Sequence, residues 1–305
     1  MNFDANYLAV VFNSTLRMMT PILYVSLGSA LCNRVFIFNI GLEGTMLTGA
    51  FTSIVVNYYT GSVLLSLLGA MISAMIVSWV AGIFMVKFQG AMLVVGVSIN
   101  MIISGLTTFL MQLIFGMKGA YVSTDLVALD KIDISFLSRW PILTTMFGSL
   151  TYVDLFAFVL AFLLYLFLFR TVTGFHMRSV GINKTAAKSL GVNADRLQIG
   201  TVAFSGLLSG IGGCLLTMGG VTMFAQNITA GRGFIAMAAA TLGGAHPLGV
   251  VAASAFFGLA QSMANMLQNS SISSELTMAL PYLSTIFALA FYNFVQIRRS
   301  KPSKN

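Results

Sequence analysis

Long apolar segments separated by short polar stretches follow one another along the whole chain. Several of these segments reach about 20 residues, the length at which a helix crosses the ~30 Å hydrocarbon core of a bilayer. The pattern predicts a short helical stretch at Tyr7–Leu16 and then a series of spans. The predicted spans are Met18–Leu31, Thr45–Tyr58, Val63–Val86, Met92–Phe115, Val153–Phe169, Leu197–Met218, Phe234–Leu242, Pro247–Leu267 and Pro281–Ile297. We therefore expect an all-α polytopic membrane protein with about 8 to 10 transmembrane helices.

One long polar interruption divides this series between Gly116 and Leu150. It carries acidic and basic residues in similar numbers, namely Asp125, Asp130, Asp133, Lys118, Lys131 and Arg139. A mixed charge of this kind suits a loop on the outer side of the membrane. Nothing in this loop, 116–150, could build a core of its own, so we predict a single transmembrane domain over residues 1–305.

The composition supports a membrane protein and argues against several other classes. Hydrophobic residues make up 57% of the chain and charged residues 8%, with a mean hydropathy of +0.91. Soluble domains carry about 25% charged residues. A β-barrel would show shorter segments of alternating polarity. The net charge is +8, but a nucleic-acid-binding protein would need a soluble basic face, which this chain lacks.

The positive charges gather in two places. Five cations opposed only by Asp195 lie in one short polar segment, and four more close the chain. These residues are Arg170, Arg178, Lys184, Lys188 and Arg196, followed by Arg298, Arg299, Lys301 and Lys304. Basic segments beside spans lie in the cytoplasm under the positive-inside rule. We therefore expect segment 171–196 and the tail inside. Counting the spans backward puts loop 116–150 and the N-terminus outside, unless Tyr7–Leu16 is itself a span or the stretch around Asn39 is re-entrant.

No arrangement of residues predicts catalysis or a metal site. The chain has no phosphate-binding loop, no paired carboxylates at helical spacing and no Ser or Cys nucleophile with a nearby His. His176 and His246 lie far apart without neighbouring ligands, which argues against a metal site. Cys32 and Cys214 lie in apolar surroundings and predict no disulfide framework. The first residues lack the basic region of a cleaved signal, so we expect insertion through the first span.

The sequence FNIGLEGTMLTGAF places the carboxylate of Glu43 in an apolar segment. Ionisable residues at membrane depth cost at least ~2.5 kcal/mol and mark a transport pathway or a buried partner. Two interpretations stay open. In one, Glu43 faces the pathway beside Asn39 and binds a polar solute. In the other, it pins the amino end of the helix from Thr45, with Gly41 and Gly44 permitting an unwound backbone.

Other polar residues within the predicted spans have the same two interpretations. Asn100 in the fourth span, and Gln261 and Asn265 at i, i+4 in the eighth, either line the pathway or bond to a neighbouring helix. Arg232 at the start of the seventh span either holds a helix end or a partner chain, or contacts substrate. The pathway candidates are Asn39, Glu43, Asn100, Gln261 and Asn265.

The sixth predicted span has a different pattern. Gly206 and Gly210 are four residues apart, and other small residues lie beside them. These are Ser205, Ser209, Gly212 and Gly213. Small residues at this spacing let helix backbones approach closely. We predict that they pack against neighbouring spans and take no part in chemistry.

The basic cytoplasmic segment contains the local signature of a short helix. Asn183 can cap a helix over residues 184–189, and Gly191 can end it. A short helix between two spans, bordered by cations, has two interpretations. It is a docking element for a partner, or it is an ordinary loop made basic by its position in the membrane.

Three motifs resemble one family of transporters. RSVGINKTAAKSLGV, from Arg178, is similar to the segment R-A-V-G-x-N-x-x-A-A-x-x-x-G-I of ABC importer permeases in the branched-chain amino acid, ribose and nucleoside branch. FNIGLEG is similar to the N-I-G-x-E-G signature of the nucleoside-type permeases, and GRGFIAMAA followed by HPLG resembles R-G-F-I-A-L-A-A and N-P-L-G. Ile182 and Lys184 depart from the pattern, where the family usually has Glu and commonly Pro. The resemblance runs from roughly Thr20 to Asn293.

This resemblance implies that the short helix is a coupling helix resting in a groove of an ATPase subunit. Its residues would be Arg178, Gly181, Asn183, Ala186, Ala187 and Gly191. The implied partners are an ATP-binding cassette ATPase, a second permease chain, homologous or identical, and an extracellular or periplasmic solute-binding protein. The chain itself would bind no cofactor, since ATP and Mg²⁺ would be held by the ATPase. Closure of the ATPase subunits would rock the attached spans between outward- and inward-facing states.

The resemblance also implies a permease subunit in a prokaryotic plasma membrane that carries a small polar solute. Nucleosides are the expected cargo, and sugars such as ribose or galactose come second. An ion-coupled secondary transporter is a different class, which paired broken helices in two halves would indicate. The sequence shows one convincing break, at residues 38–51. A third class is an assembly scaffold that transports nothing, and the coupling-helix resemblance argues against it.

Overall fold

The computed structural model describes residues 5–123, 125–133 and 141–268, and the separate positions 283, 286 and 290. Apart from those three positions, the predicted span Pro281–Ile297 lies outside the described residues, as do the basic tail after it and Arg139. Six of the described helices are long and apolar enough to cross a membrane. The prediction of a polytopic helical membrane protein is therefore confirmed.

The described helices follow the predicted spans closely. They are α1 (Ala5–Arg34), α2 (Leu42–Thr60), α3 (Val63–Val86), α4 (Met92–Phe115), α5 (Pro141–Phe147), α6 (Tyr152–Arg170), α7 (Val172–Ile182), α8 (Lys184–Ser189), α9 (Ala194–Met218), α10 (Arg232–Leu242) and α11 (Pro247–Gln268), and the strands are β1 (Ala120–Val122) and β2 (Met223–Ala225). α3, α4 and α8 begin and end at the predicted residues, and α11 begins at Pro247 as predicted.

The prediction was wrong about the first helix. A short stretch at Tyr7–Leu16 and a separate span from Met18 were expected, whereas α1 is one continuous helix of 30 residues. Arg17 interrupts the hydropathy pattern, but arginine is a good helix former and does not interrupt the backbone. Its side chain lies at a cavity inside the bundle. Because α1 is a single span, the count that puts its first turns on the outer side is unchanged.

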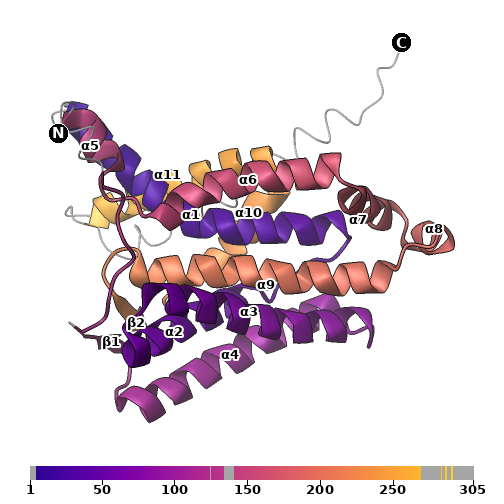
Figure 1. Ribbon diagram of the computed structural model, residues 1–305, viewed down its shortest axis with the longest axis horizontal. Helices are drawn as coiled ribbons and strands as arrows, with labels where there is room; N and C mark the ends of the chain where they lie inside the picture. Colours follow the sequence, from indigo (N-terminus) through magenta and orange to yellow (C-terminus); the bar gives the residue numbers. More distant parts are fainter. Residues whose placement is uncertain are drawn as a thin grey trace.

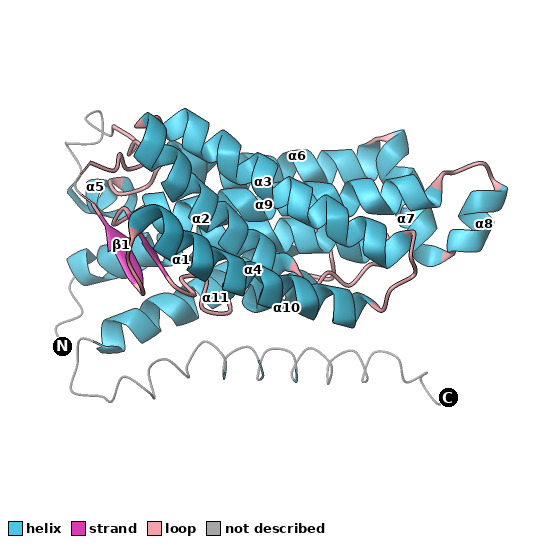
Figure 2. Cartoon of the chain, turned by 90° about the horizontal axis from the view of Figure 1, so that it is seen from below, coloured by secondary structure: helices cyan, strands magenta, loops and turns pink. Residues whose placement is uncertain are grey.

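α9 lies at the centre of the bundle (Figure 1), between α1 and α6 on one side and α2 and α3 on the other. The long helices run along a common direction. At one end lie β1, β2 and α5, and we call this the sheet end. At the other lie α7 and α8, and we call this the α8 end, because α8 projects beyond the bundle there (Figure 2). The cations of α7 to α9 lie at the α8 end, so the positive-inside rule predicts that this end faces the cytoplasm.

Glycines bring α9 into backbone contact with its neighbours. A Cβ atom on Gly206 would overlap Ser78 of α3, and one on Gly210 would overlap the Ala70 carbonyl of the same helix. A Cβ atom on Gly213 would overlap the backbone of α2. The prediction that the small residues of this span serve close packing is therefore confirmed.

A small antiparallel sheet closes the sheet end and is an exception to the all-α prediction. Tyr121 of β1 pairs with Phe224 of β2. Asn57 near the end of α2 holds the segment after β1, because its Nδ2 donates to the Val127 carbonyl and its Oδ1 accepts from the Val127 N–H, each at 2.9 Å. Segments from both halves of the chain thus meet at this end.

Candidate functional site

The predicted break before α2 is present at mid-depth in the bundle. α1 ends at Arg34, and the chain then returns through residues 35–41 before α2 begins. Asn39 is buried here. Its Oδ1 accepts from the Gly41 N–H at 3.1 Å, and its Nδ2 donates to the Ser205 hydroxyl near the middle of α9 at 3.2 Å. Asn39 therefore holds the unwound backbone against the central helix.

Asn100 of α4 caps α2 from outside that helix. Its Oδ1 accepts from the Gly44 N–H at 2.8 Å, and its Nδ2 donates to the Ile40 carbonyl at 3.0 Å. α2 has no side-chain cap of its own at Gly41, so Asn100 supplies a partner for one of the free N–H groups of the first turn. Of the two interpretations of Asn100, the structure shows bonding to a neighbouring helix.

Gly44, the second glycine of the break, has a role other than the unwound backbone that was expected of both glycines. Gly41 was expected to permit an unusual backbone, but its φ is −69°, which any residue adopts. What Gly44 provides, together with Gly96 of α4, is space. A Cβ atom on Gly44 would lie 2.9 Å from the Asn100 Oδ1, and one on Gly96 of α4 would lie 2.9 Å from the Gly41 nitrogen. The glycines let α4 approach closely enough for Asn100 to reach the break.

A second break, which the sequence analysis missed, precedes α10. The chain turns back through residues 226–231, with positive φ at Asn227, Ala230 and Gly231, and α10 then begins inside the bundle. Arg232 holds this turn, since its Nη1 donates to the carbonyls of Ile228 and Thr229 at 3.0 and 3.3 Å. Arg232 thus holds a helix end, one of the roles proposed for it.

Glu43 joins the two breaks. Its Oε1 accepts from the Gly231 N–H at 2.9 Å, and its Oε2 accepts from the Gly233 N–H at 2.6 Å. The side chain is buried, with 9% of its surface exposed. A carboxylate is well matched to this place, because the first N–H groups of a helix lack partners and carry partial positive charge. Glu43 pins a helix end, as one interpretation held, but that helix is α10 and not its own.

α2, a helix of 19 residues, and α10, a helix of 11 residues, run in opposite directions from the same place. α2 runs toward the sheet end, where Asn57 bonds to the loop after β1. α10 runs toward the α8 end, where Arg34 of α1 donates to the Ala245 carbonyl just beyond it at 2.8 Å. The Glu43 carboxylate lies between the two amino ends. Paired broken helices therefore occur in both halves of the chain, whereas the sequence indicated only one.

The remaining pathway candidates lie elsewhere. Gln261 and Asn265 are half-buried on α11, which packs along α1. The Asn265 Nδ2 donates to the Met18 sulfur of α1 at 3.6 Å. Within the described residues, no hydrogen bond joins either side chain to the Glu43 cluster. The structure thus brings Asn39, Glu43 and Asn100 together and places Gln261 and Asn265 apart from them.

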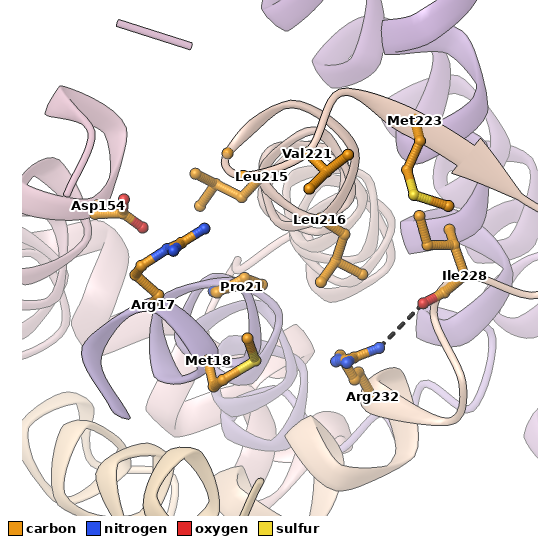
Figure 3. Close-up of a pocket in the computed structure, with 12 residues that line it drawn as sticks. Arg17, Met18, Pro21, Asp154, Leu215, Leu216, Val221, Met223, Ile228 and Arg232 are labelled. Carbon is orange, nitrogen blue, oxygen red and sulfur yellow. Dashed lines mark hydrogen bonds between the residues drawn. The ribbon is translucent and has the colours of Figure 1, made fainter. Parts of the chain in front are cut away.

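A cavity of about 290 Å³ opens toward the sheet end beside the second break. Figure 3 shows Arg17 of α1 and Asp154 of α6 turned toward each other on one side, with Arg232 of α10 on another. Asp154 is buried and accepts from the hydroxyls of Thr20 and Thr151. Sequence reasoning assigned no role to Arg17 or Asp154. The signal was available, because each is an ionisable residue within or beside an apolar run.

The predicted short helix is confirmed at the α8 end. The Asn183 Oδ1 accepts from the Ala186 N–H at 3.0 Å, and Gly191 follows the helix with φ 85°. Ala187 is buried against the bundle. Lys184 and Lys188 both pair with Asp195, at 2.9 and 2.6 Å. The helix is therefore fixed in position by its cap, its buried face and its ion pairs.

The segment before α8 is anchored to the end of α1. A Cβ atom on Gly181 would overlap the Arg34 carbonyl, so only glycine allows this approach. The Arg178 guanidinium lies 5.0 Å from the ring centre of Phe169 at the end of α6. By contrast, Ile182 and Leu190, on either side of α8, are 88% and 84% exposed. Two large apolar side chains thus stand free, one at the end of α7 and one just after α8, beside a helix that is otherwise firmly held.

Helices of membrane-spanning length around two opposed breaks in the chain indicate a membrane transport protein. The chain belongs to the family described as branched-chain amino acid transport system / permease component, which it matches over residues 11–289. It is 35% identical over 295 residues to the guanosine ABC transporter permease protein NupQ of Bacillus subtilis, covering 92% of this chain and 91% of the relative.

Two further relatives come from Lactococcus lactis. The nucleoside ABC transporter permease protein NupC is 32% identical, covering 94% of this chain and 93% of the relative. NupB, of the same description, is 26% identical, covering 95% and 82%. No solved structure matches the chain. The chain is accordingly a permease subunit of an ABC importer, a multi-pass protein of the prokaryotic plasma membrane that works with an ATPase partner. Its role is transport.

Proposed function

We propose that this permease carries nucleosides. The observation that supports the proposal is the likeness, over nine-tenths of the chain, to permeases named for guanosine and for nucleosides. The described interior is compatible with an uncharged solute, because its carboxylates Glu43 and Asp154 are already bonded to groups of the protein. Nucleosides are neutral and rich in hydrogen-bonding groups. They need polar partners along the pathway more than charged ones.

Two of the predicted pathway residues suit this role. Asn39, Glu43 and Asn100 already bond to the backbone or to α9. The Asn265 amide bonds only to a thioether, a weak acceptor. Its oxygen, and the amide of Gln261, have no hydrogen-bond partner in the described part of the chain. We propose that Gln261 and Asn265 face the cargo, while the other three candidates maintain the two breaks.

Nucleoside transport is tested by uptake of labelled guanosine in cells that lack their own nucleoside uptake. The cells would express this chain with its ATPase, a second permease and the binding protein. We expect unlabelled nucleosides to compete with the uptake of labelled guanosine, and ribose and galactose to leave it unchanged. Uptake should stop when the ATPase is left out. Competition by sugars alone would assign a sugar substrate. Uptake that persists without the ATPase and collapses with the ion gradient would contradict an ABC mechanism.

We further propose that α8 is the contact through which the ATPase drives the spans. The observation that supports it is the exposure of Ile182 and Leu190 on either side of a helix whose backbone is fixed by Asn183 and Gly191. Exposed apolar side chains on a rigid element are typical of docking sites. The anchor between Gly181 and Arg34 links α8 to α1. Movement of α8 would therefore be passed to a spanning helix.

Placing a carboxylate at this contact is expected to uncouple transport. In Leu190→Asp, burying an unpaired charge at the interface should weaken ATPase association about 10- to 100-fold. Val172→Asp is the control, because Val172 is 71% exposed at the first turn of α7, where a carboxylate is tolerated. Co-purification of the ATPase and guanosine uptake measure the effect. Equal retention of the ATPase by Leu190→Asp and Val172→Asp would contradict docking at α8.

The remaining partners are also proposals. Two permease chains of one Lactococcus lactis strain, NupB and NupC, are both similar to this chain, which supports pairing with a second, homologous permease. A binding protein would deliver the solute at the sheet end, the outer side. We propose that the chain performs no catalysis and binds no cofactor, and that ATP and Mg²⁺ are held by the ATPase. The domain assignment, one transmembrane permease domain over residues 1–305, stays a prediction.

A further inference from the structure

A basic groove lies at the α8 end between the turn after α3 and the helices α8 and α9. Its volume is about 970 Å³. Cations from three separate segments line it, namely Lys87 after α3, Lys184 and Lys188 of α8, and Arg196 of α9. These segments are far apart in the sequence, so the charge cluster is made by the fold and was not visible as a single run.

The charges of this groove are only partly balanced. One carboxylate, Asp195, lines it and pairs with both Lys184 and Lys188. Lys87 and Arg196 are exposed and form no ion pair with any described residue. Four cations against one carboxylate leave an excess of three positive charges. A groove with this excess favours an anionic occupant.

A separate apolar groove lies farther along α3 and α4, and the two grooves share no lining residue. It has a volume of about 460 Å³ and lies between α3 and α4. Phe84 lines the apolar groove and Lys87 lines the basic one. These two residues are three positions apart, which is a rise of only ~4.5 Å along a helix axis. On α4, Met92 lines the basic groove and Val94 the apolar one. The two grooves are therefore consecutive along the membrane normal, with the charges toward the cytoplasm.

We propose that this composite site binds an anionic phospholipid. The headgroup phosphate would lie among the four cations, and one acyl chain would lie in the groove between α3 and α4. Basic pockets at the cytoplasmic ends of spanning helices suit anionic lipid headgroups, and the apolar walls lie at the depth of acyl chains. A cytoplasmic protein would reach the cations but not the apolar groove. A second permease chain packed on α3 and α4 would cover the apolar groove but would leave the four cations of the basic groove without a counter-charge.

The site also contacts the proposed docking element. Lys184 and Lys188 belong to α8, whereas Lys87 belongs to the turn after α3. A phosphate bound between them would tie α8 to the α3–α4 pair. The proposal does not depend on the identity of the transported solute, because none of these residues lines the cavity near the second break.

The test measures lipid binding to the purified full-length chain by native mass spectrometry, and the stabilisation that binding gives by thermal unfolding. The probes are dioleoyl phosphatidylglycerol, dioleoyl phosphatidylcholine, glycerol 3-phosphate and inorganic phosphate. We expect phosphatidylglycerol to bind and to stabilise the chain more than phosphatidylcholine. The double variant Lys87→Gln with Arg196→Gln should weaken phosphatidylglycerol binding about 30-fold, since each cation near the surface strengthens binding about fivefold. Both residues are exposed, so folding should be kept.

Two further variants make the test specific. Lys118→Gln with Lys131→Gln removes two cations at the opposite end and should leave phosphatidylglycerol binding unchanged. Ile99→Trp narrows the apolar groove and should weaken phosphatidylglycerol but not glycerol 3-phosphate. Equal binding of the two lipids, or wild-type binding by the Lys87 and Arg196 variant, would overturn the proposal. Full competition by inorganic phosphate, with no effect of Ile99→Trp, would assign a phosphate site and likewise overturn it.

Discussion

Replacing Glu43 with glutamine is expected to lower the stability of the permease and abolish transport together. The carboxylate accepts from two backbone N–H groups of α10, those of Gly231 and Gly233. Glutamine keeps one acceptor and turns an NH₂ group toward the other N–H. Hydrogen bonds to a charged acceptor contribute about 1.5–3 kcal/mol each, so the free energy of unfolding should fall by about 2 kcal/mol or more. The amino ends of α2 and α10 would then no longer be joined.

Thermal unfolding of the purified chain without any nucleoside separates this role from a direct contact with cargo. A lower Tm for Glu43→Gln in the absence of solute identifies a structural brace. A normal Tm with a raised KM for guanosine would mean that the carboxylate meets the cargo. Normal values of both would exclude any role for the charge. Asp125→Asn is the matched control, because it removes a carboxylate that is exposed at the sheet end.

Features set by local sequence could be predicted. α3 and α4 begin and end where hydropathy predicts. Each polar backbone group without a partner in lipid carries its own free-energy cost, so the ends of a span depend on the local sequence. α8 was predicted from Asn183 and Gly191 alone, since a cap and a left-handed residue define a short helix without help from the rest of the fold.

Features set by contacts between distant segments could not be predicted. A carboxylate at membrane depth indicates that a partner exists, but the partners of Glu43 are N–H groups 188 and 190 residues away. Backbone groups have no side-chain signature. The turn before α10 was missed for the same reason. Gly231 and Gly233 mark it in the sequence, but glycines are also common in ordinary loops. The need for glycine at Gly44 and Gly96 is visible only in the structure, where Asn100 lies beside the break and leaves no room for a Cβ atom.

Valine at Gly210 is expected to prevent the bundle from forming. Gly210 lies where α9 crosses both α2 and α3. A Cβ atom there would lie 3.0 Å from the Ala74 Cβ, and a Cβ atom on the facing Gly49 of α2 would lie 2.5 Å from the Gly210 Cα. Protein interiors are close-packed, and overpacking commonly costs about 1–3 kcal/mol. Here the obstructing atoms are largely backbone, so relief requires whole helices to separate. We expect a loss at or above the upper end of that range.

Gly200 provides a control within the same helix. A Cβ atom there meets no atom within 4 Å, so Gly200→Val makes the same change in helix propensity without a packing conflict. The yield of monodisperse protein, its Tm and guanosine uptake should stay near wild type in Gly200→Val and collapse in Gly210→Val. Because the two substitutions are chemically identical, the difference measures the contact between backbones alone. Similar yields and Tm values for the two variants would show that α9 is not held by this close approach, and the central position assigned to it would lose its physical basis.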